Sequence, residues 1–120
     1  MADRDRRGAE RRGRRAEWIA LWWLRLKGYR ILSLRFKCRL GEIDIIAQKG
    51  RTLAFIEVKQ RAAIETALHA VTPTAWQRIA RAAHLWAGQN RKAQSLDWRF
   101  DLIAIAPRRW PRHNRDYWRP

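Results

Sequence analysis

The sequence is poor in cysteine, in acidic residues and in long apolar runs, and each shortage excludes a class of protein. Its single cysteine, Cys38, cannot form an internal disulfide and has no second cysteine with which to share a zinc ion. This usage favours a reducing compartment, and we expect a cytoplasmic protein. The longest apolar stretch, WIALWWL at 18–24, is too short to cross a membrane, and we expect neither a membrane protein nor a secretory signal.

Basic residues outnumber acidic residues by 27 to 11, so the 120-residue chain has a formal net charge of +16. An excess of this size favours a polyanionic partner, most simply a nucleic acid, with an acidic membrane surface as the alternative. Arginines are frequent at both ends of the chain. We expect a disordered basic arm at residues 1–12, one folded domain at 13–106, and a basic tail rich in Pro, Trp and Arg at 107–120.

Apolar periodicity predicts the order helix, three strands, helix, strand. The first helix is expected from near Ala9 to Lys27, and the second from the N-cap Thr72 to Gly88. The segment 60–71 gives no clear signal. The four strands are predicted at 29–36, 41–47, 53–59 and 98–106.

The strand at 98–106 is a nearly continuous apolar run, typical of a strand buried on both faces. Because it follows a helix, we expect it to lie parallel to one of the earlier strands. The chain is therefore predicted to be an α/β protein with a small mixed sheet flanked by helices. Asp101 in this strand is interpreted as a strand-edge acid that pairs with Arg99, and the three histidines are given no role.

The second and third predicted strands contain charged residues at positions where strands are usually apolar. The four are Glu42, Asp44, Glu57 and Lys59. A two-residue loop at Gly50-Arg51 would place Asp44 opposite Glu57 on one face of the hairpin, and Glu42 opposite Lys59. A loop shifted by one residue would keep the same faces aligned.

Two carboxylates that face each other repel, so the pair of Asp44 and Glu57 would destabilise the hairpin unless a cation lies between them. Mg²⁺ or Mn²⁺ would fit this pair, with the main-chain carbonyl of Val58 as a further oxygen ligand. Lys59 would then orient or activate a water molecule, or stabilise charge in a transition state. A cross-strand salt-bridge lattice is the alternative; it explains Glu42 with Lys59 well but Asp44 with Glu57 poorly.

Asp44 followed after twelve residues by Glu57-Val58-Lys59 resembles the PD-(D/E)xK signature of restriction endonucleases and archaeal Holliday-junction resolvases. With GRRAEWIALWWLRLKGYRIL upstream and RFDLIAI downstream, residues 13–106 resemble the bacterial YraN-type family of uncharacterised, proposed endonucleases. The resemblance implies a restriction-endonuclease-like core, so that 13–106 would be a single nuclease-like domain. The implied catalytic residues are Glu17, Asp44, Glu57 and Lys59, and the implied metal ligands are Asp44, Glu57 and Val58.

The same resemblance extends to residues that would contact nucleic acid. Glu42 belongs to the Gly-Glu-Ile-Asp box of the family and Arg61 to its Lys-x-Arg ending. Many relatives have a lysine after the Thr-Pro start of the second helix, which Gln77 or Arg78 would replace here. The expected nucleic-acid contacts are therefore Glu42, Arg61, Gln77, Arg78 and Arg81.

The eight tryptophans raise the question of base stacking. Trp110 and Trp118, among arginines of the tail, are the two candidates for stacking on bases. The others that fall on helical or strand stripes are expected in the core. They are Trp22, Trp23, Trp76 and Trp98.

Three functional classes agree with these patterns. The first is a metal-dependent endonuclease that hydrolyses phosphodiester bonds in DNA, with branched or structured DNA as one candidate substrate. The second is a non-catalytic nucleic-acid-binding protein on a nuclease fold, and the third is a module that binds an acidic protein. A homodimer is also considered, because nucleases of this type often cut as dimers. The patterns leave open whether the substrate is DNA or RNA.

Overall fold

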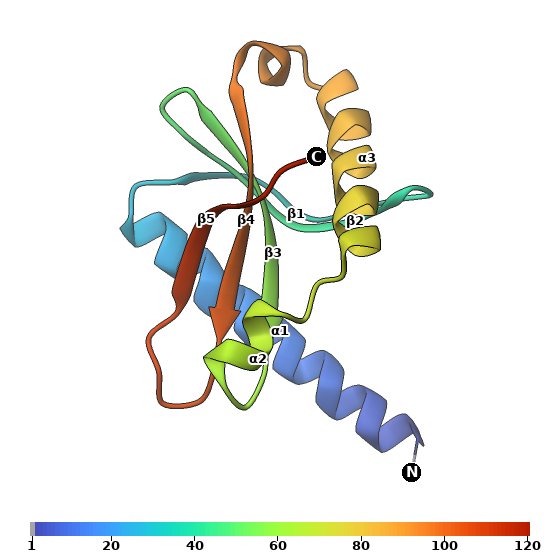
Figure 1. Cartoon of the computed structure of the whole chain (residues 1–120), viewed down its shortest axis with the longest axis vertical. Helices are drawn as coiled ribbons and strands as arrows, with labels where there is room; N and C mark the ends of the chain where they lie inside the picture. The colour runs from blue at the N-terminus through green and yellow to red at the C-terminus, as the bar shows by residue number, and fades with distance from the viewer. Residues whose placement is uncertain (1) are drawn as a thin grey trace.

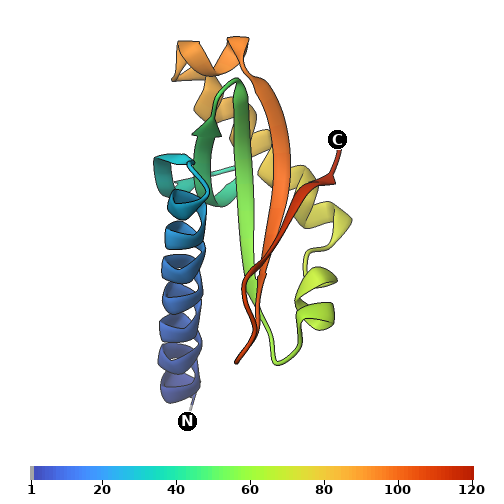
Figure 2. The same ribbon diagram turned by 90° about the vertical axis from the view of Figure 1, so that its left-hand side faces the viewer.

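The structure is a computed structural model that places residues 2–120 and describes the side chains of residues 13–120. A five-stranded mixed sheet forms its centre, with helix α1 (Ala2–Leu26) on one face and helix α3 (Pro73–Gly88) on the other (Figures 1 and 2). This confirms the predicted fold class, an α/β protein with a restriction-endonuclease-like core. Within the described part of the chain, no helix is long and apolar enough to span a membrane.

The strands follow one another in the sheet in the order of the sequence. β3 and β4 are parallel, as the helical crossover predicted, and the other neighbouring pairs are antiparallel. The strands are β1 (Arg30–Cys38), β2 (Gly41–Lys49), β3 (Thr52–Gln60), β4 (Asp97–Ile105) and β5 (Arg112–Trp118).

The β2–β3 hairpin has the predicted two-residue loop, because Lys49 pairs with Thr52 across Gly50-Arg51. Gly50 has φ +60, a left-handed conformation that glycine adopts without steric cost. The pairing of β2 with β3 ends at Ile45 and Ile56, while the first half of β2 remains paired with β1. Beyond Ile45 the two strands therefore separate into a fork.

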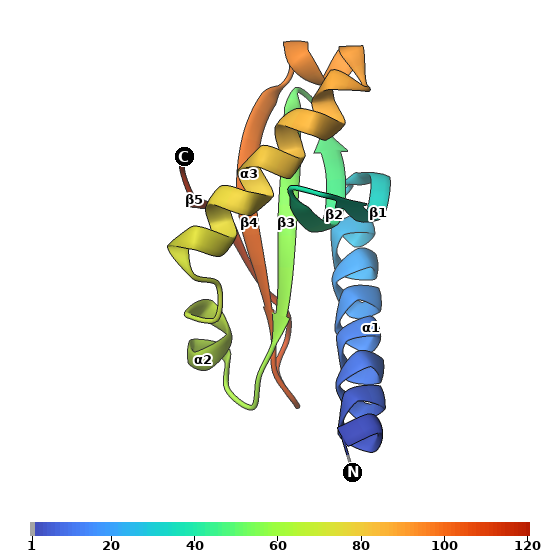
Figure 3. The same ribbon diagram turned by 90° about the vertical axis from the view of Figure 1, so that its right-hand side faces the viewer.

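The separated end of the β1–β2 hairpin packs against α3. A Cβ on Gly41 would lie 2.9 Å from the main-chain oxygen of Arg78, closer than real Cβ atoms approach. Only glycine fits this contact without displacing the backbone of α3. Figure 3 shows the hairpin end beside α3.

The sheet has an apolar core on each face. On the α1 side, Ala16, Ala20 and Leu24 pack against β-strand residues such as Ile45 and Ile56. On the α3 side the buried residues include Phe55, Phe100, Trp76, Ile79 and Trp86. The predicted N-cap is confirmed, since Thr72 Oγ1 accepts a hydrogen bond from the Ala75 N–H at 3.1 Å.

The predicted start of the first helix was wrong, and the middle segment that gave no clear signal contains a helix. Helix α1 begins at Ala2 rather than near Ala9, so the expected disordered arm at 1–12 is helical from residue 2 onward. Alanine and arginine favour helix, and a helix that is nucleated by its packed half extends at low cost. The segment 60–71 contains a short helix, α2 (Ile64–Leu68), whose Ile64 and Ala67 are buried.

The segment predicted as a basic tail, 107–120, contains strand β5, which pairs with β4 at the edge of the sheet. Trp118, predicted to stack on bases, instead stacks on Trp76 at 5.8 Å between ring centroids and joins the core. The alternation of β5 is interrupted by a register shift opposite Phe100 and Leu102, with Asp116 at φ +54. Trp22, predicted in the core, is 46% exposed.

Candidate active site

Asp44 lies in the fork where β2 leaves β3. Its Oδ2 accepts a hydrogen bond from the main-chain N–H of Val58 at 2.8 Å. The carboxylate thus satisfies a β3 backbone donor at a point where the pairing of β2 with β3 has ended. This contact fixes Asp44 beside the Glu57-Val58-Lys59 segment.

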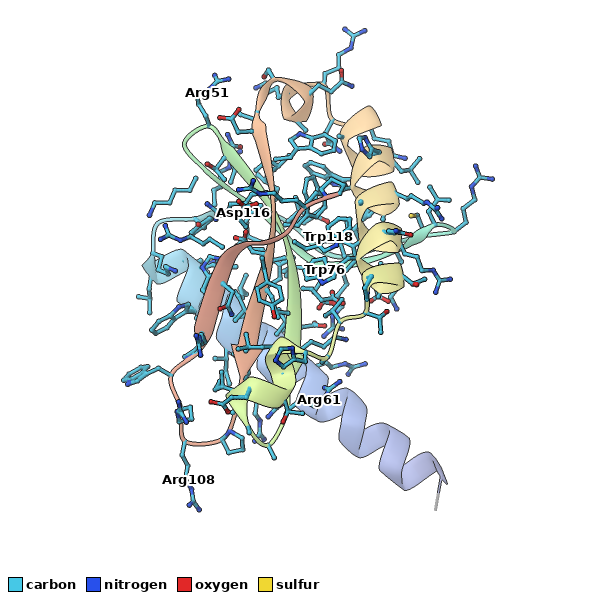
Figure 4. All side chains as sticks on the ribbon, viewed as in Figure 1. Arg51, Arg61, Trp76, Arg108, Asp116 and Trp118 are labelled. Carbon is cyan, nitrogen blue, oxygen red and sulfur yellow. The ribbon has the colours of Figure 1, made fainter. Side chains whose placement is uncertain are left out.

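A cavity of about 600 Å³ opens beside this contact. It brings together Glu17 from α1, Asp44 from β2, and Val58 and Lys59 from β3. Arg61 also lines it, and Figure 4 shows Arg61 just beyond the end of β3. Three of the four predicted catalytic residues therefore share one cavity, together with the predicted ligand Val58.

Glu57, the fourth, lies on the other side of the fork. It lines a neighbouring cavity of about 390 Å³ with Glu42 and Arg78. Burial, followed by the charge and hydrogen bonding of Asp44, raises the pKa of Glu57 to about 9. The Lys59 ammonium, 3.7 Å from Glu57 Oε2, lowers this pKa but does not cancel the other causes. At neutral pH the raised pKa favours the protonated form of Glu57 as long as no metal ion lies beside it.

Glu17 is anchored from the first strand. Its Oε2 accepts a hydrogen bond from Nε of Arg35 at 2.6 Å, and its side chain is 23% exposed. Arg35 adopts φ +52, which is rare outside glycine. The pair holds the carboxylate at the rim of the cavity rather than out in solvent.

The residues at the fork fit a divalent cation. Asp44 and Glu57 supply carboxylate oxygens, and their crowding is the electrostatic situation that a cation relieves. Gln60 lines the same cavity as Asp44, and its Oε1 is a buried acceptor without a hydrogen-bond partner among the described residues. Within that same part of the chain, no three His, Cys, Asp or Glu side chains gather closely enough to hold a metal by themselves.

The predicted nucleic-acid contacts divide into three groups. Arg61 lines the cavity of Asp44, while Glu42 and Arg78 line the cavity of Glu57. Gln77 and Arg81 are exposed on α3 and line neither cavity. The structure thus gathers three of these five residues around the fork.

Sequence reasoning missed a second polar cluster, around Asp101. Asp101 pairs with Arg99 as predicted, but it is fully buried and β4 is not an edge strand. It also contacts His113 of β5, to which the sequence analysis gave no role. No sequence signal could have joined His113 to Asp101, because this contact depends on the unpredicted strand β5.

The five-stranded mixed sheet flanked by helices defines a protein with a restriction-endonuclease-like core. The chain belongs to the uncharacterised protein family UPF0102, whose family model matches residues 16–105, and this is the YraN-type family. It is similar to a UPF0102 protein of Maricaulis maris, with 47% identity over 98% of this chain and 92% of the relative. It is also 54% identical to a UPF0102 protein of Caulobacter vibrioides, over 92% of this chain and 88% of the relative.

Proposed function

We propose that this protein is a metal-dependent endonuclease that hydrolyses phosphodiester bonds in DNA, with branched or structured DNA as its substrate. The observation that carries the proposal is the fork between β2 and β3. There Glu17, Asp44, Val58 and Lys59 line one cavity, and Glu57 crowds Asp44 strongly enough to retain a proton. The formal net charge of +16 supports a polyanionic substrate.

Asp44, Glu57 and the Val58 carbonyl would hold Mg²⁺ or Mn²⁺. When bound, such an ion neutralises charge that develops on the phosphate and acidifies a water molecule. In the hydrolysis, the oxygen of water bonds to phosphorus, the bond from phosphorus to one ester oxygen breaks, and that oxygen leaves with a proton. Lys59 would orient the attacking water or stabilise negative charge in the transition state, and Arg61 would contact a phosphate of the bound strand.

The proposal is tested by incubating the purified chain with labelled linear, single-stranded, flap and four-way-junction DNA, in Mg²⁺, in Mn²⁺ and in EDTA. We expect cutting of at least one substrate in the presence of metal and none in EDTA. An RNA version of each substrate distinguishes the two nucleic acids. Salt-sensitive binding to DNA with no cutting of any substrate would contradict catalysis and favour a non-catalytic binding protein on the same fold.

Asp44→Asn is a better inactive variant than Asp44→Ala. The amide oxygen of Asn can still accept the Val58 N–H, whereas Ala would leave that buried donor unpaired and would perturb the fork. Asp97→Asn is the matched control, because Asp97 is an exposed acid at the opposite end of the sheet, in register with Thr52. We expect cleavage to be lost in Asp44→Asn and unchanged in Asp97→Asn.

A further inference from the structure

A chain of polar side chains connects the buried residue Asp101 with the surface beside α1. Arg99 donates two hydrogen bonds to Asp101, through Nε and Nη2, each at 2.8 Å. The Asp116 N–H donates a third at 2.9 Å, at the bulge of β5. His113 Nε2 lies 2.7 Å from Oδ2 of the same carboxylate, and the His113 side chain is only 2% exposed.

This series of polar side chains ends at Lys27, in the turn after α1. Lys27 Nζ lies 2.8 Å from Nδ1 of His113. An ammonium group can only donate, so Nδ1 accepts and the Nε2–H of His113 donates to Asp101. The buried Asp101 and His113 therefore hold the Lys27 ammonium in place through one of its three N–H bonds. A lysine supported in this way loses less side-chain entropy when it binds a ligand.

Two further cations surround Lys27. The pKa of Lys27 is lowered by burial and then by the charges of Arg115 and Lys49. The Lys49 side chain lies against the turn at Gly28 and over the ring of Tyr29. Among residues 13–120, none of the three cations forms an ion pair with a carboxylate. The Asp101 carboxylate acts on Lys27 in the opposite sense, but it does not cancel the other causes, and the pKa of Lys27 stays lowered. An anion beside the three cations would relieve the remaining repulsion.

An exposed aromatic ring packs on the last turn of α1, which leads into Lys27. Trp110, in the loop before β5, is 80% exposed and contacts Trp23 of α1 at 5.8 Å between ring centroids. Trp23 precedes Lys27 by four residues, and its carbonyl accepts a hydrogen bond from the main-chain N–H of Lys27 at 3.2 Å, so the two residues lie one turn apart. The end of α1 and strand β5 lie side by side in Figure 1, and Figure 4 shows Arg108 of the same loop pointing into solvent.

We propose that Lys27, Lys49 and Arg115 clamp one phosphodiester group of a single-stranded nucleic-acid segment, whose neighbouring base stacks on Trp110. An exposed ring can stack on a base only if that base is unpaired, which favours a single strand over a duplex. A phosphate beside a base-stacking ring is the arrangement by which proteins bind single strands without reading their sequence.

The clamp also deepens the proposed function and to this extent rests on it. Lys27 follows Glu17 by ten residues of α1, which is about 15 Å along the helix axis. At about 3.4 Å per stacked nucleotide, this distance corresponds to roughly four nucleotides. A strand held by the clamp would therefore reach the fork of β2 and β3, which suits a flap or another substrate with an unpaired arm.

The experiment measures binding of labelled oligothymidylates to the full chain in EDTA, so that cleavage plays no part. Strand lengths from about 3 to 12 nucleotides are compared over a series of salt concentrations. We expect Lys27→Met, Lys49→Met and Arg115→Gln each to weaken binding about tenfold. Each should also make the salt dependence of log K shallower by about 0.7. Trp110→Ala should weaken binding about tenfold through lost stacking and leave the salt dependence unchanged.

Two matched variants control for general effects. Lys92→Met removes one exposed charge from the 3₁₀ helix (Arg91–Ser95), and Trp18→Ala removes a ring that is 59% exposed on α1. We expect binding in both to remain within about twofold of the unmodified chain. Arg115 is exposed and lies outside both apolar cores, so Arg115→Gln keeps the test valid if a Lys27 variant is unstable.

Other outcomes would overturn the inference. It fails if Lys92→Met weakens binding as much as Lys49→Met, or if Trp110→Ala and Trp18→Ala behave alike. It fails equally if duplex binding depends on the clamp as much as single-strand binding does. It also fails if inorganic phosphate binds at the clamp but the clamp variants bind oligonucleotides of every length as tightly as the unmodified chain does. Failure of the nuclease proposal looks different, since the clamp variants would still lose binding while no substrate is cut.

Discussion

At the scale of single residues, the main electrostatic feature of the fork is the interaction of Asp44 with Glu57, which raises the pKa of Glu57. Asp44 is held by the Val58 N–H, and Glu57 is crowded by Asp44 in a buried position. The sequence predicted that these two acids would meet, because the hairpin loop fixed the register. It could not predict that Asp44 and Glu57 would line different cavities, because this depends on where β2 leaves β3.

Glu57→Gln should change how stability depends on pH. The pKa of Glu57 is about 9 in the folded chain and near 4.5 when unperturbed, so between these values the folded state holds a proton that the unfolded state has lost. The contribution of Glu57 to the free energy of unfolding is therefore complete below about pH 4.5. It falls as pH rises toward 9, by up to about 1.4 kcal/mol per pH unit.

Urea unfolding of both proteins in EDTA from about pH 5 to 9 checks this prediction. The difference in unfolding free energy between Glu57→Gln and the unmodified chain should move in favour of the variant as pH rises. Glu65→Gln, at an exposed position in α2, is the control and should track the unmodified chain. Parallel curves for all three proteins would mean that Glu57 is already ionised in the folded state.

Binding of Mg²⁺ should release about one proton at pH 7. A carboxyl group must ionise before it coordinates a metal, and the raised pKa of Glu57 means that this group is the source of the proton. Calorimetric titrations in two buffers of different ionisation enthalpy give the number of protons released. Glu57→Gln should bind more weakly and release none, while an enthalpy that does not depend on the buffer would contradict the assignment of Glu57 as a ligand.

At the scale of elements, the parts with local signals were predictable. The Thr72-Pro73 start of α3, the loop at Gly50-Arg51 and the parallel strand β4 each follow from turn chemistry, capping or topology. Strand β5 had no such signal. Its bulge interrupts the alternation of exposed and buried positions, and its one neighbour in the sheet is β4, the strand that precedes it in the sequence.

Asp101→Asn should destabilise the attachment of β5 to β4. The buried carboxylate accepts hydrogen bonds from Arg99 and the bulge N–H and contacts His113. Burial alone would raise the pKa of Asp101, but the hydrogen bonds from His113 and Arg99 outweigh it, and the pKa is lowered. Replacing one partner of a buried ionic network costs about 3 kcal/mol or more, so the loss should be measurable by urea unfolding.

Asp116→Asn provides the control for this substitution. Asp116 is exposed and pairs with Arg119, and Asn tolerates its positive φ, so we expect a change within about 0.5 kcal/mol. Equal stabilities of the two variants would indicate that the Asp101 network does not hold β5 in place. Because the pKa of Asp101 is depressed, its contribution should also be lost only in acid, as pH falls below the ordinary value of 3.8.

At the scale of the whole molecule, the charge and the fold point to the same partner by independent routes. The net charge of +16 follows from the amino-acid composition alone. The fork and the proposed Lys27 clamp, in contrast, exist only in the folded structure. The composition predicted a polyanion, but the path of a strand across the surface could not be predicted. The proposed path depends on contacts that join the C-terminal end of α1 and the turn after it to β5 and the loop before it. Examples are the contacts of Lys27 with His113 and of Trp23 with Trp110.

The most direct test of the account is the single-turnover cleavage rate of a labelled DNA flap in Mg²⁺, compared between the unmodified chain, Asp44→Asn and Asp97→Asn. The account predicts metal-dependent cutting that falls by about a hundredfold or more in Asp44→Asn and is retained in Asp97→Asn. Equal rates in all three proteins would place the activity outside the fork. Absence of cutting in the unmodified chain, on this flap and on the other DNA and RNA substrates, would contradict its assignment as an endonuclease.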